Sequence, residues 1–120
     1  MTAKPPDLPV LTPAEALRRQ GERVVVQFHM RGGDINPRSG HVGLYSETSF
    51  LNEGNLIVRI LKSELEKFPA KSDRELLDSY RSKEIRVRGS VQMNWIRVNN
   101  KLMNRPIIEV GDPEQIQIVK

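Results

Sequence analysis

Two stretches of the chain alternate apolar and polar side chains, and this alternation limits the fold more than any other feature. Apolar residues occupy every second position from Val24 to Met30, and again from Ile85 to Met93 with Gly89 as the one small member. A two-residue repeat is typical of strands that bury one face and expose the other. The residues predicted to form the core, including those of the most apolar strand at 56–61, are Val24, Val26, Phe28, Val58, Ile60, Ile85, Val87 and Val91.

Helical patterns interrupt these strands at residues 62–80. Ser63 and Ser72 each begin a Ser-x-x-Glu capping box, and Pro69 separates the two turns. The candidates for the buried side of this segment are Leu65, Phe68, Leu76, Leu77 and Tyr80. The segment is expected to close one end of the barrel with Leu65, Phe68, Leu76 or Leu77.

The N-terminal part is predicted to be an extended arm over residues 1–11, which contain three prolines, followed by a single domain over residues 12–120. A helix is predicted to begin at Thr12, which starts a Thr-x-x-Glu capping box, and to end at Gly21.

Weaker patterns predict the remaining strands and turns. Residues 42–46 and 107–110 carry further apolar positions, and 116–119 form a short closing strand. The glycine-rich stretch 32–40 is predicted to be a loop. Asn99 and Asn100 are predicted to form a hairpin turn, because asparagine tolerates positive φ.

The predicted order is a helix, three strands, a helix and two strands, followed by a terminal strand segment. Three strands, a helix and two further strands are the topology of the oligonucleotide/oligosaccharide-binding (OB) barrel. The predicted fold is therefore all-β, a five-stranded OB barrel with a helix between strands three and four and an N-terminal helix. A split βαβ fold would need a helix between the first two strands, where the sequence predicts none.

Two stretches carry a resemblance to a known family. Residues 80–91 are similar to the pattern Y-x-G-K-x-I-R-V-x-G-x-V, and residues 105–116 match R-P-x-I-x-V-x-D-P-x-Q-I. A weaker F-L-N segment matches residues 50–52. With these motifs the chain resembles bacterial single-domain OB proteins of the nucleic-acid-binding, anticodon-domain-like type.

The resemblance implies that Gly89 lets the fourth strand bend over the barrel. It also implies that Asp112 and Pro113 turn the chain into its closing strand. The sequence departs from the family pattern at Ser82, where a glycine is usual, and over residues 93–104, which are longer than the usual turn. Because one fold serves many functions, the resemblance indicates the fold more strongly than the ligand.

Charge and composition narrow the function classes. The chain carries 19 basic and 15 acidic residues, for a net charge of +4. This charge is compatible with binding to a polyanion, but also with an ordinary mixed surface that keeps a protein soluble. No apolar run approaches the roughly 20 residues of a membrane span, so no membrane partner is expected. The absence of cysteine excludes disulfides, thiol catalysis and thiolate metal sites. The compartment is left open, since a removed signal peptide leaves no trace.

The hairpin at residues 93–106 is the main candidate for ligand binding. It contains the only tryptophan, Trp95, together with Arg97, Lys101 and Arg105, and no acidic residue. Cations that follow phosphates and a ring that stacks on a base are the features of single-strand binding by OB barrels. Two alternatives are that Trp95 packs over a barrel end, or that the hairpin contacts a protein partner or a second copy of the chain.

The full set of predicted nucleic-acid-binding residues is Trp95, Arg97, Lys101, Arg105, Arg86, Arg88, Arg59 and Tyr45. Arg86 and Arg88 share a strand face, and with Arg59 on a neighbouring strand and with His29 and Arg31 they would form a basic stripe. The alternative is a solvated sheet face.

No catalytic constellation emerges from the sequence. His29 and His41 are too few for a metal site, and Ser39 beside His41 lacks the third member and oxyanion donors of a triad. The chain is therefore expected to be a binding module without metal or cofactor, and not an enzyme.

Overall fold

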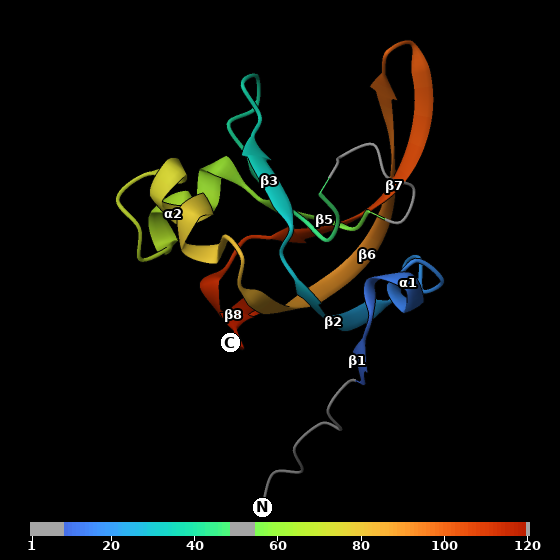
Figure 1. Cartoon of the computed structure of the whole chain (residues 1–120), viewed down its shortest axis with the longest axis horizontal. Coiled ribbons are helices and arrows are strands. Elements are labelled where there is room, and N and C mark those ends of the chain that lie inside the picture. The colour runs from blue at the N-terminus through green and yellow to red at the C-terminus, as the bar shows by residue number, and fades with distance from the viewer. Residues whose placement is uncertain (1–8, 49–54, 120) are drawn as a thin grey trace, which may run out of the picture.

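The computed structural model describes residues 9–48 and 55–119, which form a strongly curled sheet with helices at its ends (Figure 1). The F-L-N motif at residues 50–52 lies outside the described residues, as does most of the N-terminal arm. The elements are β1 Val10–Leu11, α1 Pro13–Ala16, β2 Arg23–His29, β3 Gly32–Ile35, β4 Val42–Tyr45, β5 Ile57–Ile60, η1 Lys62–Lys67, α2 Asp73–Tyr80, β6 Glu84–Val98, β7 Lys101–Val110, η2 Pro113–Gln115 and β8 Ile116–Ile118.

The sheet curls into a barrel because β2 and β3 act as one bent strand. The strands follow the order β2-β6-β7-β5-β4-β3, which returns to the strand from which it started. The exchange of partners happens within one residue: Met30 N–H donates to Lys83 O (2.8 Å), and Arg31 N–H donates to Tyr45 O (3.0 Å). With β2 and β3 counted together, β4, β5, β6 and β7 complete the five-stranded OB barrel that the sequence predicts.

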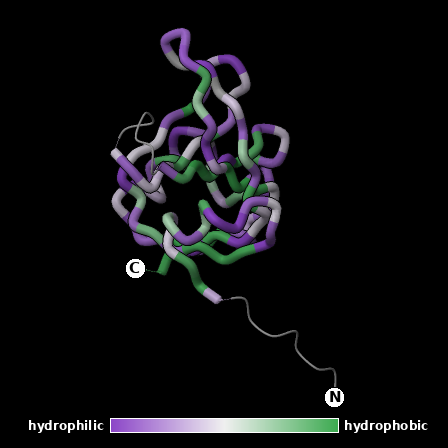
Figure 2. Tube along the Cα trace, turned by 90° about the vertical axis from the view of Figure 1, so that its right-hand side faces the viewer, coloured by the Kyte–Doolittle hydropathy of each residue, from purple (hydrophilic) through white to green (hydrophobic). Residues whose placement is uncertain are grey.

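The alternation predicted for β2 and β6 is confirmed in register and in burial. Val26 lies opposite Val87, and Phe28 lies opposite Ile85. All eight predicted core residues are buried, and apolar segments line the centre of the barrel in Figure 2.

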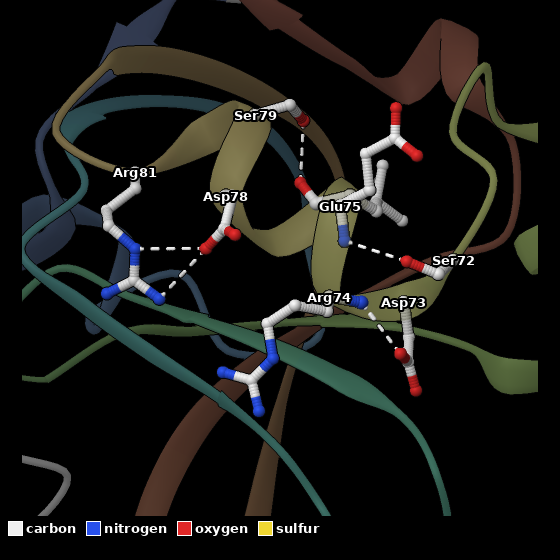
Figure 3. A network of polar contacts seen from close by, with 8 residues as sticks. Ser72, Asp73, Arg74, Glu75, Asp78, Ser79 and Arg81 are labelled. Carbon is white, nitrogen blue, oxygen red and sulfur yellow. Dashed lines mark hydrogen bonds and ion pairs between the residues drawn. The ribbon is translucent and has the colours of Figure 1, made fainter.

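The helical segment between β5 and β6 closes one end of the barrel, as predicted. At the start of α2, Ser72 Oγ accepts a hydrogen bond from Glu75 N–H (3.1 Å), which caps the helix (Figure 3). Phe68, Leu76 and Leu77 are buried in the core. The capping box predicted at Ser63 is wrong, because η1 begins directly after β5 and has Leu61 at its N-cap without a side-chain bond.

The prediction of a loop over residues 32–40 is wrong in its first half, where Gly32–Ile35 form β3 and pair with β4. A Cβ at Gly33 would lie 2.6 Å from Gly43 O and 2.8 Å from Leu77 Cδ1. The glycine therefore serves close packing within a strand and not a turn.

The N-terminal helix is shorter than the sequence predicts. Its capping box is present, with Thr12 N–H donating to Glu15 Oε1 (3.0 Å) and Glu15 N–H donating to Thr12 Oγ1 (3.2 Å). The helix ends at Ala16, however, and Gly21, at φ +83°, donates its N–H to Val91 O (2.7 Å). Gly21 and Glu22 thus continue the β2–β6 ladder, since Val91 N–H also donates to Glu22 O (3.0 Å). Val10 and Leu11, at the end of the predicted arm, pair in parallel with β2.

Strand β6 joins the two halves of the barrel. Its first half pairs with β2 on one side and β8 on the other, and its second half pairs with β7. On one side of β6 the partner changes from β8 to β7 between Val87 and Val91. Gly89 lies in the middle of this interval, and a Cβ there would lie 2.6 Å from Ile108 Cγ2. Asn99 and Asn100, at φ 50° and 65°, form the predicted turn to β7. Ser82, where the family usually has glycine, holds a left-handed φ of 61°.

The described part of the chain contains no helix that is long and apolar enough to cross a membrane.

Replacing Phe28 by alanine is expected to lower the free energy of unfolding by about 3–5 kcal/mol, because the cavity left in the core removes packing and apolar burial together. Urea denaturation measures the change. His29→Ala, at an exposed position on the same strand, is the control and is expected to cost far less. Equal losses for both variants would contradict the register described for β2.

Gly89→Ala is expected to destabilise the fold by about 1–3 kcal/mol, because the added methyl overlaps the branched side chain of Ile108. Gly111→Ala is the matched control, since a Cβ there meets nothing closer than Glu64 Cγ at 3.5 Å. Thermal unfolding of both variants checks the prediction. Similar melting temperatures for the two would show that the fold does not depend on the close approach of Gly89 and Ile108.

Candidate nucleic-acid interface

A groove of about 390 Å³ lies on the outer face of the barrel, over β4, β5 and β7. The loop between β3 and β4 contributes to one of its sides. The lining residues are Asp34, Asn36, Ser39, His41, Gly43, Tyr45, Ile57, Arg59 and Ile107.

The floor of the groove is a small apolar cluster separate from the core. It consists of Tyr45, Ile57 and Ile107, which are neighbours in register across three adjacent strands. Atoms Cε1 and Oη of Tyr45 lie 3.1 and 3.2 Å from the point where Gly43 would carry a Cβ. The ring therefore lies across Gly43, and a larger residue there would displace it.

The hydroxyl of Tyr45 is fixed by Asp34 on β3. It donates a hydrogen bond of 2.6 Å to Asp34 Oδ1. Burial, and then this bond and the carboxylate charge, raise the pKa of Tyr45 above the ordinary tyrosine value. The phenol is therefore neutral across the physiological range. Because its proton is donated to Asp34, the hydroxyl oxygen of Tyr45 can only accept further hydrogen bonds.

The wall formed by residues 36–41 is held by its own polar contacts. Asn36 Oδ1 accepts hydrogen bonds from the N–H groups of Arg38 (2.9 Å) and Ser39 (3.1 Å), an Asx turn. His41 Nδ1 accepts from Lys62 N–H (3.0 Å), which ties the loop to η1. The wall thus presents polar side chains on a fixed backbone.

Arg59 supplies the positive charge within the groove. Its side chain is half-buried on β5, on the same strand face as Ile57. A guanidinium beside an apolar floor and a polar wall matches a ligand that combines anionic, planar and hydrogen-bonding parts.

The structure divides the predicted hairpin residues between two faces. The β6–β7 ladder runs without a bulge from Val91 opposite Ile108 to Val98 opposite Lys101. Alternation along this ladder therefore places Lys101 and Arg105 on the side of Ile107 and the groove. Trp95 and Arg97 lie on the reverse side, in phase with the buried Val91.

The two faces differ in exposure. Trp95 is 68% exposed and Leu102, on the same side, is 61% exposed. Arg105 is buried, and its guanidinium donates to Asn104 O (3.1 Å) and contacts Met103 Sδ (3.8 Å). The interpretation of Trp95 as a residue packed over a barrel end is therefore wrong, because the ladder carries it beyond the core.

The predicted basic stripe does not form. Arg86 donates from Nε (3.0 Å) and from a terminal nitrogen (2.7 Å) to Gln27 Oε1, and Gln27 Nε2 donates to Glu84 Oε2 (2.6 Å). Glu84 is also the register partner of His29. Arg59 is not on a neighbouring strand, because β5 pairs with β4 and β7 and not with β6. Arg88 is exposed on the same part of β6 as Arg86.

Sequence reasoning placed only Tyr45 and Arg59 of the groove residues in the site. The two isoleucines of the floor were detectable in principle, since 56–58 and 107–108 are unbroken apolar runs. Such runs indicate strands covered on both faces. Asp34, Asn36 and Ser39 carry no comparable pattern.

Among residues 9–48 and 55–119, no three side chains of histidine, cysteine, aspartate or glutamate gather in a way that could hold a metal ion.

Comparison with known proteins shows the fold. No protein-family model matches the sequence, and no curated protein matches it. An aspartyl-tRNA synthetase from Entamoeba histolytica superposes with a TM-score of 0.58 at 11% identity, over 94% of this chain and 21% of the synthetase. An OBody bound to hen egg-white lysozyme superposes with a TM-score of 0.50 at 17% identity, over 98% of both chains. The chain thus spans about a fifth of the synthetase.

The two tyrosines of the chain are expected to resist ionisation in the folded state. Burial also raises the pKa of Tyr80. Since both phenols hold their protons more tightly in the folded than in the unfolded state, their contribution to the stability of the fold is complete below about pH 10 and is lost as the pH rises above that value. The ultraviolet absorbance of tyrosinate follows the titration.

Native protein is expected to show little tyrosinate at about pH 10, where free tyrosine is half ionised. Tyr45→Phe leaves Tyr80 as the only tyrosine, so a comparison with the wild type assigns each titration step to one of the two residues. The contrary result is a tyrosine of the folded wild type that is half ionised at about pH 10 and whose titration is missing in Tyr45→Phe. That result would mean that the hydrogen bond from Tyr45 to Asp34 is not formed in solution.

Proposed function

We propose that this chain is a non-catalytic nucleic-acid-binding module that holds a single strand in the groove over β4, β5 and β7. The observation that carries the proposal is the apolar floor of Tyr45, Ile57 and Ile107 beside the cation of Arg59. Bases need a flat apolar surface and phosphates need a cation, and the two occur here within one groove.

Charge and position support the same ligand class. The net charge of +4 favours a polyanion. Lys101 is exposed on the groove side of β7 and extends the basic surface from Arg59 toward the hairpin, whereas Arg105 lies on the same side but is buried. The aspartyl-tRNA synthetase that shares the fold is named after a nucleic acid, tRNA. In this proposal Arg59 and Lys101 contact phosphates, and the wall residues Asn36 and Ser39 contact base edges.

Arg86 and Arg88 have a smaller part in the proposal. The guanidinium of Arg86 is already engaged by Gln27, and both arginines lie on β6, which contributes no lining residue to the groove. We therefore propose them as members of a solvated sheet face.

The test is the affinity for fluorescent single strands of about 12 nucleotides, within the span of one OB barrel. Anisotropy titrations between about 50 and 200 mM salt give the slope of log affinity against log salt. Arg59→Ala is expected to lower that slope by about one, with little dependence on base identity.

Arg74→Ala is the matched control, because it removes the same charge from α2, which contributes no lining residue to the groove. Equal slopes for Arg59→Ala and Arg74→Ala would exclude a phosphate contact at Arg59. Dissociation constants above about 1 mM at low salt, for both DNA and RNA strands, would end the proposal.

A second candidate function, contact with a protein partner or a second copy of the chain, is favoured by the exposure of Trp95 and Leu102. Under this alternative, sedimentation would show an assembly that Trp95→Ala dissociates without unfolding. Binding of every oligonucleotide would be weak.

A further inference from the structure

The β6–β7 hairpin extends from the barrel as a free ribbon. Outward of Met93 and Pro106, neither strand pairs with any other described strand. At about 3.4 Å per residue, the ribbon from Met93 to Val98 reaches roughly 17 Å. Figures 1 and 2 show it as a projecting arm whose tip is hydrophilic.

The cations of the ribbon lie on opposite faces. Arg97 is on the reverse side with Trp95, and Lys101 is on the groove side. Both side chains are exposed, and residues 91–108 include no acidic side chain. A single strand lying in the groove passes along the groove side of the ribbon only. The proposed function therefore gives Arg97, on the reverse side, no phosphate to contact.

We propose that this hairpin is an arm that enters the groove of a nucleic-acid duplex adjoining the single strand. The inference rests on the proposed function and names its substrate more closely: a junction between a single strand and a duplex. The two phosphate backbones that border a duplex groove then lie on either side of the ribbon, within reach of Arg97 and Lys101.

The dimensions of a two-stranded ribbon suit this role. The major groove of B-form DNA is about 12 Å wide and admits a β-ribbon. In A-form RNA the wide, shallow minor groove offers phosphates and 2′-hydroxyls to the same ribbon. The deep major groove of B-form DNA meets the requirement for anionic walls on both faces, and the shallow groove of A-form RNA meets it for the face that lies against it.

Trp95 and Leu102 have a place in the same arrangement. They lie diagonally across the two strands on one face of the ribbon, where both are exposed, and together they make a small apolar patch. A duplex that ends at a junction exposes the apolar face of its last base pair, which is wider than a single base. The patch is suited to cover that face, because an indole stacks on any base.

A second copy of the chain fits this surface less well. Two exposed side chains offer on the order of 300 Å², whereas a stable interface buries about 800 Å² on each partner. The ribbons of two copies would also bring together arginines and lysines with no acidic partner on either hairpin.

The experiment compares three fluorescent ligands with the full chain: a strand of about 12 nucleotides, the same strand continued into a duplex of roughly 10 base pairs, and that duplex alone. Both strand polarities, in DNA and RNA, are included. The wild type is expected to bind one junction at least about tenfold more tightly than either part.

Arg97→Ala is the decisive variant, because Arg97 is exposed and lies away from the proposed groove. It is expected to lower the salt slope for the junction by about one and to leave the slope for the single strand unchanged. Trp95→Ala is expected to weaken junction binding about tenfold. Arg74→Ala serves again as the control for lost charge, and circular dichroism confirms folding of each variant.

The outcomes separate the two proposals. Equal affinities for single strand and junction, or an Arg97→Ala effect that is the same on both, would overturn the duplex arm and leave the proposed function intact. No binding of any ligand would overturn both. Self-association that Trp95→Ala abolishes, without preference for the junction, would assign the arm to a second copy instead.

Discussion

The close approach of β6 and β7 at Gly89 and Ile108 is the contact on which the rest of the structure depends. Because Gly89 has no side chain, Ile108 Cγ2 can occupy the space where a Cβ would lie, and β6 passes without a break from its ladder with β2 to its ladder with β7. One continuous strand thereby belongs to both halves of the barrel. Its alternation also passes unchanged from the core into the hairpin and decides which face each hairpin residue occupies.

The groove is a consequence of the same closure. When the barrel closes through β5 and β7, the outer faces of β4, β5 and β7 become one surface on which Tyr45, Ile57 and Ile107 meet. Glycine at position 43 leaves room for the ring of Tyr45, and Asp34 fixes its hydroxyl. A second apolar cluster outside the core is thus built from strand pairing alone.

The sequence predicted the features that depend on local pattern. Alternation identified β2 and β6 with their buried faces, and the side chains of two consecutive asparagines identified the hairpin turn. Gly32 and Gly33 were misjudged, because glycine signals a turn by its freedom but here serves a close approach that only the folded barrel creates. The groove was largely missed because the β5–β7 pairing joins residues about 50 positions apart in parallel, which no local pattern reveals.

The faces of the hairpin were also within reach of the sequence. The alternation Ile85, Val87, Gly89, Val91 and Met93, continued by two residues, places Trp95 in phase with the core and on the reverse side from the groove.

The aromatic content decides which force dominates at the groove. Of the aromatic residues that the structure describes, Phe28, Phe68 and Tyr80 are committed to the core. Tyr45 lies in the groove with its hydroxyl bound, and Trp95 lies on the reverse face of the hairpin. A single strand held in the groove as proposed would meet one aromatic ring and two isoleucines, so stacking would contribute less than in barrels that display several rings. Its affinity would come mainly from the cations, and binding controlled by cations is steeply weakened by salt and tolerant of sequence.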